Sequence, residues 1–340
     1  MPYQNVGTPR FFVCGLQWMK SLGLLTSPPV EDETYRNTRD PLEVIGINPT
    51  SPFEIISYHQ PGNPVNLYYN FVNFPLFSSK SWIGLLGHNL YSTGLAMNVW
   101  NYGGQTVTSM NNVFARNAER DGNFMMSAPN DGFSIWGFSL DAADQQLYFA
   151  FSGGYVSLMC NTICAGQYFD MPHSPDLKLT MTRESGNTKS YRSKRGSTFT
   201  NSFYIKPPMW GPVAPWELYE EPYMTTQPLS RSGRRVWDLS FNYLSDSSIF
   251  PDTASLSRAE EGGGYSFNYN DGFDNTLLHD YNFYSQVIHK TNGGELPFIF
   301  QPDKNDTTQF AKCRFDMSAF KFTQVANGVY NIKLKIRETW

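Results

Sequence analysis

The side chains that could carry acid–base or nucleophilic chemistry are few and widely spaced. The histidines form no HExxH motif and no other pair four residues apart, and the chain holds no G-x-S-x-G sequence. Zinc hydrolases use the first pattern and serine hydrolases of the α/β type use the second. We therefore predict that all five are hydrogen-bonded structural residues. They are His59, His88, His173, His279 and His289.

Acidic residues offer a second route to catalysis, because glycoside hydrolysis uses two carboxylates about 5 to 9.5 Å apart. Glu217, Glu220 and Glu221 form one acidic group, and Glu260 with Glu261 forms another. Carboxylates in polar loops are mostly solvated, so neither group is predicted to be catalytic.

A nucleotide site is not indicated either. The triglycine at residues 262–264 is not followed by the Lys-Ser/Thr of a phosphate-binding loop. We predict no enzyme, no catalytic residue and no cofactor.

The four cysteines are Cys14, Cys160, Cys164 and Cys313. On one extended strand Cys160 and Cys164 would lie about 13 Å apart, too far to share a zinc ion. A turn at Asn161-Thr162 could instead bring them together beside His173 or Asp170. Since free cysteines are usually buried, we predict buried thiols and no metal.

Tryptophans are the residues best suited to contact a sugar or a partner protein. Stacking on a sugar ring and anchoring an interface both use large aromatic faces, so the two alternatives stay open. The candidates are Trp82, Trp136, Trp210 and Trp216.

Basic residues form two local clusters, and three more alternate along the last strand. Each set is either a solvated face or a contact for an acidic neighbouring subunit. The clusters are Lys189, Arg192, Lys194 and Arg195, then Arg231, Arg234 and Arg235. The interface candidates are Arg234, Arg235, Lys333, Lys335 and Arg337.

Composition restricts the class of partner. Only 16% of the 340 residues are charged, 16% are aromatic, and the net charge is −4. Uncharged aromatic surfaces suit subunit contacts, whereas this net charge gives no field that attracts nucleic acid. No run of 18 apolar residues is present, so we expect no membrane insertion and synthesis in the cytoplasm.

Short apolar runs separated by turn residues predict a mainly β protein with two sandwich- or barrel-like domains. We expect an N-terminal arm over residues 1–40, with a short helix within 15–25, then a β-sandwich over 41–152. A C-terminal β-domain over 153–340 would carry one helix, at 276–290 and capped by Asn275.

Within the C-terminal domain, three segments are predicted in more detail. A hairpin is expected from 177 to 199 with its turn at 184–187, and the Pro/Trp-rich segment 206–222 is expected to be an ordered loop or an arm. Residues 246–271 are polar and Gly-rich, which predicts a loop. Residues 315–340 predict a closing hairpin with Asn327-Gly328 at its turn and alternating buried residues from Tyr330 to Ile336.

Three stretches, SWIGLLGHNL at 81–90, GRRVWDLSF at 233–241 and HKTNGGELPFIFQPD at 289–303, resemble structural tail proteins of tailed bacteriophages, especially marine ones. The segments 310–316 and 330–340 are also similar to the close of such proteins. The first stretch resembles a strand of galactose-binding-like jelly rolls. The resemblance implies a ring-forming distal or minor tail protein and offers no catalytic residues to transfer.

From the residues and this resemblance we expect a non-enzymatic virion protein of the tail, made in the host cytoplasm. It would form a homo-oligomeric ring, sixfold by analogy, between the tail tube and the tail hub or tip. One alternative is a tail protein that binds carbohydrate on the host receptor. Another is a tail enzyme that degrades polysaccharide.

Overall fold

The protein is described from a computed structural model, which covers residues 6–27, 35–37, 40–50, 53–57, 65–71, 80–101, 109–120, 125–139, 146–153, 158–177, 180–204, 206–211, 213–218, 233–252 and 276–340. These residues form a mainly β fold with several antiparallel sheets and short helices. The predicted mainly β class is confirmed.

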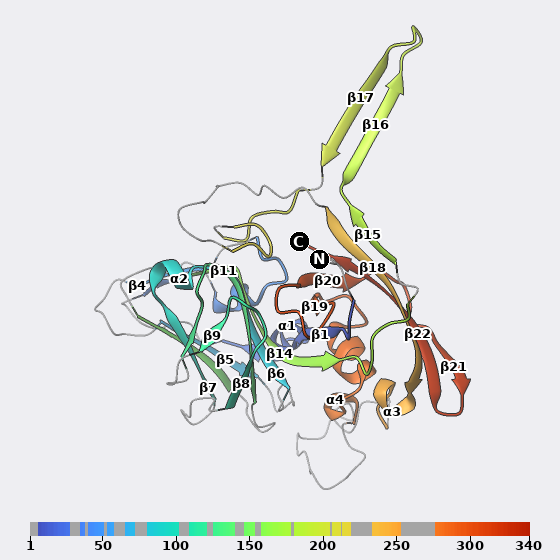
Figure 1. The fold of residues 1–340 in the computed structure, drawn as a ribbon. Helices are drawn as coiled ribbons and strands as arrows, with labels where there is room; N and C mark the ends of the chain where they lie inside the picture. The colour runs from blue at the N-terminus through green and yellow to red at the C-terminus, as the bar shows by residue number, and fades with distance from the viewer. Residues whose placement is uncertain are drawn as a thin grey trace.

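One large antiparallel sheet contains eleven of the described strands and runs through the whole body (Figure 1). In spatial order they are β15 (Thr180–Glu184), β18 (Arg234–Ser245), β22 (Val329–Glu338), β20 (Ala311–Phe315), β19 (Phe298–Gln301), β1 (Arg10–Cys14), β14 (Thr162–Asp170), β6 (Ser81–His88), β11 (Gly132–Ser139) and β8 (Ser109–Val113), with β21 (Phe322–Ala326) paired to β22.

A second sheet packs against the β14, β6 and β11 part of the large sheet, and the two enclose the first hydrophobic core. Its strands are β2 (Leu25–Thr26), β5 (Val65–Phe71), β12 (Gln146–Ser152), β7 (Ala96–Asn101), β10 (Met126–Ser127) and β9 (Glu119–Arg120). A small sheet of β13 (Leu158–Cys160), β4 (Phe53–Ser57) and β3 (Tyr35–Asn37), with η1 (Pro41–Ile45) and α2 (Leu90–Thr93), completes this half. The two facing sheets include β2 and β14, which lie outside residues 41–152, and the predicted jelly-roll sandwich over 41–152 stays a prediction.

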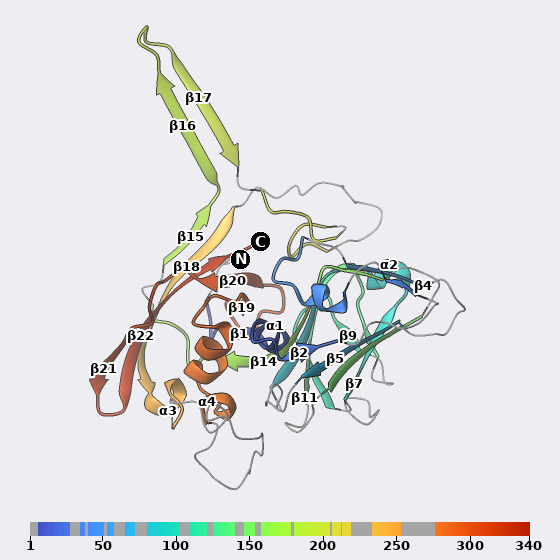
Figure 2. The same ribbon diagram turned by 180° about the vertical axis from the view of Figure 1, so that it is seen from behind.

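The other half of the large sheet is covered by short helices, which enclose a second core (Figure 2). They are α3 (Asp246–Ile249), α4 (Thr276–His279), the π-helical turn η3 (Tyr284–Ile288) and the 3-10 turn η4 (His289–Thr291). Their buried side chains, including Phe283 and Val287, contact Phe11 and the apolar face of β22.

Strand β1 is the central strand between the two cores. It pairs with β14 on one side and β19 on the other. Because side chains alternate along a strand, Phe11 and Val13 enter the second core, while Phe12 and Cys14 enter the first. The predicted N-terminal arm is therefore wrong for these residues, and only the helix within it, α1 (Gly15–Ser21), matches the expectation.

The predicted domain boundary at residues 152/153 does not separate two sheets. β6 and β11, from before the boundary, lie in the large sheet with β14, from after it. Gly166 of β14 allows β1 and α1 to approach, because a Cβ there would collide with the carbonyl oxygen of Val13. The sheet is one continuous element with a separate core on each face.

The helix predicted over 276–290 is broken at residues 280–282. Asn282 precedes the second piece, and its Oδ1 accepts a hydrogen bond from the Ser285 backbone N–H at 2.8 Å. Asparagine competes with helical hydrogen bonding in this way. The expected Asn275 cap lies outside the described residues, as does most of the predicted loop 246–271, whose first residues form α3.

The closing hairpin is confirmed in its second half. β21 and β22 are joined by the turn at Asn327-Gly328, where Gly328 has φ 66°. Burial alternates along β22 as predicted: Ile332, Leu334 and Ile336 are buried, and Lys333 and Lys335 are exposed. Phe315 belongs instead to β20, which pairs with the far end of β22. The C-terminal strand is thus shared by three neighbours.

A two-stranded hairpin of β16 (Gly186–Arg192) and β17 (Thr198–Tyr204) projects far from the body (Figure 1); we call it the arm. The turn predicted at residues 184–187 is wrong, because β15 continues through Ser185 directly into β16. Gly186, with φ 127°, absorbs the change of direction there. The chain turns back at residues 193–197, where the Ser193 N–H donates to the Ser197 carbonyl.

Candidate functional site

The tryptophans of strands β6 and β11 lie inside the protein. Trp82 is 0% exposed, and its Nε1 donates to the carbonyl oxygens of Val13 and Gln167 at 3.1 and 3.2 Å. Trp136 is 1% exposed and donates to the Glu119 carbonyl. A buried ring whose N–H is already bonded cannot stack on a sugar, so both are removed as carbohydrate candidates.

Trp210 and Trp216 hold the Pro/Trp-rich segment onto its own body. Their rings meet edge to face at 5.2 Å, and Trp216 also packs on Phe133 at 5.0 Å and on Phe310. Trp210 is buried and Trp216 is half-buried. Over residues 206–211 and 213–218 the segment is therefore an ordered loop and not a free arm, and these rings are packing anchors inside one chain.

The basic interface candidates mostly bind acids or aromatic rings of the same chain. Arg235 is half-buried and forms a bidentate ion pair with the buried Glu338, and its Nη2 also donates to the Phe310 carbonyl. The guanidinium of Arg234 lies 4.6 Å from the Trp340 ring. The remaining pairs are Lys335 with Asp316 and Arg337 with Glu184. Of the five basic residues, Lys333 alone has no such partner among the described residues. The side chains that were expected to contact an acidic neighbouring subunit therefore mostly contact groups of their own chain.

The Arg337–Glu184 pair is half-exposed, with side-chain exposures of 41% and 36%. Because water screens such pairs, we expect Arg337→Ala to lower the free energy of unfolding by only about 0.2 to 1 kcal/mol. Urea unfolding of the variant and the wild type measures this difference. A loss above about 2 kcal/mol would mean that the pair joins β15 to β22 more strongly than its exposure implies.

One serine and one histidine do meet, but with the wrong hydrogen-bond direction for catalysis. His88 Nε2 lies 2.9 Å from Ser134 Oγ, and His88 Nδ1 accepts from the Leu90 backbone N–H at 3.3 Å. The proton is therefore on Nε2, which donates to Ser134, and Ser134 in turn donates to the Asn117 carbonyl at 2.5 Å. A general base must accept the serine proton. This buried chain of bonds is structural.

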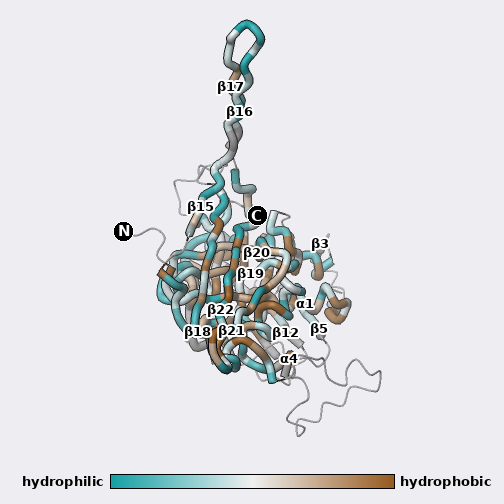
Figure 3. The backbone as a smooth tube through the Cα atoms, turned by 90° about the vertical axis from the view of Figure 1, so that its right-hand side faces the viewer, coloured by the Kyte–Doolittle hydropathy of each residue, from teal (hydrophilic) through white to brown (hydrophobic). Residues whose placement is uncertain are grey.

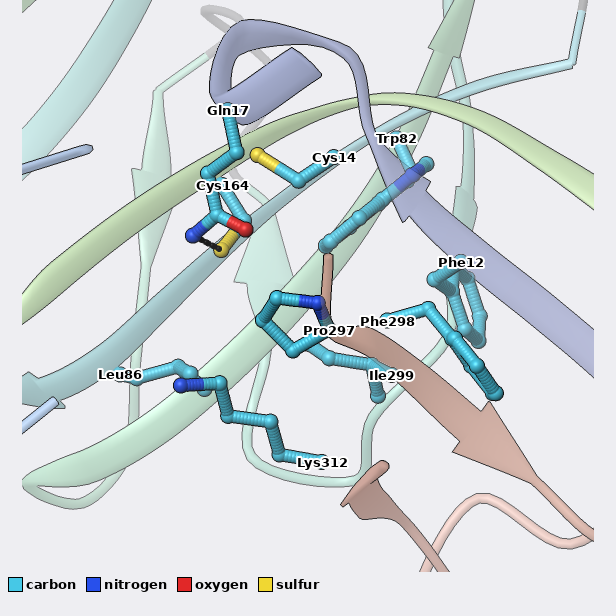
Figure 4. A pocket seen from close by; sticks show the side chains of 10 residues that line it. All are labelled: Phe12, Cys14, Gln17, Trp82, Leu86, Cys164, Pro297, Phe298, Ile299 and Lys312. Carbon is cyan, nitrogen blue, oxygen red and sulfur yellow. Dashed lines mark hydrogen bonds between the residues drawn. The ribbon is translucent and has the colours of Figure 1, made fainter. Parts of the chain in front are cut away.

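A cavity of about 10 Å³ lies between α1, β14 and β19, with Cys14 and Cys164 side by side on one side and Lys312 on another (Figure 4). The hydrogen bond from Cys14 and burial hold the pKa of Cys164 well above its usual range, while burial lowers the pKa of Lys312 to about 8. The Lys312 ammonium group donates to the Ile47 carbonyl. The cavity has room for about one water molecule, so no substrate fits there.

The cysteines are all buried, as predicted. Cys160 ends β13 and Cys164 lies in β14, and burial raises the pKa of Cys160 to about 12. Among the described residues no group of three or more His, Cys, Asp and Glu side chains could hold a metal ion. Of the acidic candidates Glu217 is half-buried, whereas Glu220, Glu221, Glu260 and Glu261 lie outside the described residues.

The arm is the most unusual surface of the described chain. Tyr191 and Phe199 are direct partners across its two strands and are 60% and 64% exposed. The opposite face is a ladder of hydroxyl groups, with Thr188 bonded to Ser202 and Ser190 bonded to Thr200, each at 3.2 Å. Figure 3 shows a hydrophilic tip; Lys194 and Arg195 of the first basic cluster lie in the turn there, and Lys189 and Arg192 lie along β16.

No family model, curated protein or solved structure matches the chain. The site is therefore assigned from its own geometry. No helix among the described residues is long and apolar enough to cross a lipid bilayer.

The sequence predicts a hairpin over residues 177–199, but with its turn at 184–187, so it does not predict the longer projecting arm of β16 and β17. The better signal was the segment Ser193 to Ser197, in which two serines flank Lys194, Arg195 and Gly196. Serine and glycine favour tight turns, and residues on both sides alternate between hydroxyl and larger side chains. The sequence also contains the first basic cluster, but the position of that cluster on a projecting arm depends on where the chain turns.

Proposed function

We propose that the protein is a non-enzymatic structural subunit that assembles with copies of itself through the arm. The observation that carries this proposal is a hairpin that projects from the body with two exposed aromatic side chains (Figure 1). Taken with the resemblance to phage tail proteins, the subunit would belong to a distal or minor tail ring, sixfold by analogy, between the tail tube and the tail tip.

The arm needs a partner to be stable. An isolated two-stranded hairpin is marginal in water because it has no core beneath it. Each of its strands pairs only with the other in the described chain, so each has a free edge of backbone N–H and C=O groups. Such edges readily add a further strand. Burying the Tyr191 and Phe199 rings on a partner would add hydrophobic stabilisation.

Charge favours another copy of the chain as that partner. Residues 186–204 contain four of the 26 lysines and arginines and none of the 30 aspartates and glutamates, so the rest of the chain carries a net charge of −8 against −4 for the whole. A basic arm is therefore attracted to the acidic body of a neighbour. The same acidic body repels nucleic acid, which disfavours DNA as the arm's target.

Shortening the arm tests this assignment without disturbing the body. Thr188 and Ser202 are direct partners, so residues 189–201 can be removed and replaced by an Asn-Gly turn. We expect the wild type to form oligomers in analytical ultracentrifugation and the shortened variant to remain a folded monomer. Equal oligomerisation of both proteins, or a wild type that stays monomeric, would contradict the proposal.

Charge reversal gives a matched pair of variants. Lys189→Glu with Arg192→Glu should weaken assembly, whereas Lys304→Glu with Lys321→Glu makes the same change in net charge at exposed positions of the body and should not. DNA binding that depends on the arm would point to a nucleic-acid partner instead. The position in a virion is tested separately, by immunogold labelling of purified particles, and absence from tails would remove that part of the proposal.

A further inference from the structure

The closing hairpin of β21 and β22 has an open edge. Among the described strands β21 pairs with β22 alone, so backbone N–H and C=O groups on its other side have no strand partner. The side chains from Thr323 to Ala326 are all exposed, and Val325 is 45% exposed. Figures 1 and 2 show this hairpin extending outward from the body, where another chain can reach its edge.

This edge lacks the usual protection against further strands. Proteins blunt open edges with charged residues, prolines or very short strands. The edge strands β3, β9 and β15 each contain a charged residue, and β2 and β13 are two and three residues long. By contrast, β21 reads Phe-Thr-Gln-Val-Ala and contains neither a charge nor a proline. Of the edge strands described in the body, only β8 is also five residues long and uncharged, and it lies at an end of the large sheet.

The second strand of the arm, β17, has a matching edge. It pairs with β16 alone among the described strands, and its seven residues, Thr-Phe-Thr-Asn-Ser-Phe-Tyr, carry no charge. The lysine and arginine of the two arm strands both lie on β16. Because lysines on an edge oppose strand addition, β17 is the arm strand suited to pair with another chain. Its seven residues are enough to cover the five of β21.

We propose that β17 of one copy pairs with the open edge of β21 in a neighbouring copy. This inference rests on the proposed assembly role of the arm and names where the arm binds. Strand addition gives partners to the free N–H and C=O groups of both edges. It also brings Phe199, 64% exposed, beside the exposed Val325. A neighbouring aromatic and β-branched pair stabilises paired strands.

The two strands are too far apart to meet within one chain. Figures 1 and 2 both show the arm above the body and β21 low on its flank. Each copy therefore offers two different surfaces, the arm to one neighbour and β21 to another. A contact between unlike surfaces continues from copy to copy and closes into a ring when the rotation between copies permits. This geometry suits a ring and would not stop at a two-fold dimer.

Cross-linking between copies tests the contact directly. Asn201 and Gln324 lie at the middle of β17 and β21 and are exposed, whereas the four native cysteines are buried. We expect a mixture of Asn201→Cys and Gln324→Cys proteins, oxidised with diamide, to form a disulfide-linked dimer whose joined peptides are identified by mass spectrometry. The control mixture, Asn201→Cys with Thr182→Cys on the edge strand β15, should not. Equal cross-linking in both mixtures, or preferential cross-linking to Asn111→Cys in β8, would overturn the inference.

Charging the open edge provides a second test. Thr323→Lys with Val325→Lys should raise the concentration needed for assembly about tenfold or more in analytical ultracentrifugation. Thr180→Lys with Thr182→Lys makes the same change in net charge at exposed positions of β15 and should not; circular dichroism checks that both proteins are folded. If the β21 variant assembles normally while the arm-shortened variant is monomeric, this inference is wrong and the assembly role of the arm stands. A monomeric wild type would remove both.

Discussion

Replacing Trp82 by alanine should lower the free energy of unfolding by about 3 to 5 kcal/mol. The side chain is 0% exposed and packs edge to face on Phe12 at 5.2 Å. Its removal leaves a cavity in the first core and takes a hydrogen-bond donor away from the carbonyl groups of Val13 and Gln167. The loss is measured by urea unfolding monitored by far-UV circular dichroism, a backbone signal that does not rely on tryptophan fluorescence.

The matched control is Tyr191→Ala on the arm, which removes a large exposed ring. It should change the stability of the isolated chain by less than about 0.5 kcal/mol. A Trp82→Ala protein as stable as the wild type would mean that the ring is not part of the core.

Acid should destabilise the protein through His88, because the folded state holds this ring neutral. Burial lowers the pKa of His88 from 6.5 to about 3. Between these two values the unfolded chain binds a proton that the folded chain does not, so the stability contribution present above pH 6.5 is lost as the pH falls. The loss is about 1.4 kcal/mol per pH unit, up to about 5 kcal/mol by pH 3.

The measurement compares urea unfolding of the wild type and His88→Gln at pH 7, 5.5 and 4.5. The variant has no titrating ring, so its stability should fall less steeply and the two curves should converge as the pH falls. Ser134→Ala removes the hydrogen-bond acceptor of His88 and the donor to the Asn117 carbonyl, but leaves the titrating ring in place. It should lower stability by a constant amount and keep the steep pH dependence. Parallel curves for wild type and His88→Gln would show that the ring is solvated or already charged.

Local patterns in the sequence predicted local structure well. Alternation of apolar and charged residues located β22, and Asn327-Gly328 located its turn, because both depend only on near neighbours. The short helix after Cys14 and the buried cysteines follow from similar reasoning. The mainly β class follows from many such short runs taken together.

Pairing between distant segments was not predictable in the same way. Residues 10–14 form a short apolar run that looks like part of an arm, yet it is sandwiched by strands from residues 162–170 and 298–301. No local signal specifies such partners. The tryptophans failed as surface candidates for the same reason, since Trp82 is covered by β1 and β14, whose positions depend on the whole sheet.

The burial of β1 between strands far along the chain has a consequence for synthesis on the ribosome. Phe11, for example, lies opposite Phe169 on one side and Phe300 on the other. The strand therefore leaves the ribosome long before either of its neighbouring strands has been synthesised. Non-local pairing of this kind slows folding. Until β19 is made, the apolar face of Phe11 and Val13 has no second core to enter, so nascent chains are expected to depend on chaperones to avoid aggregation.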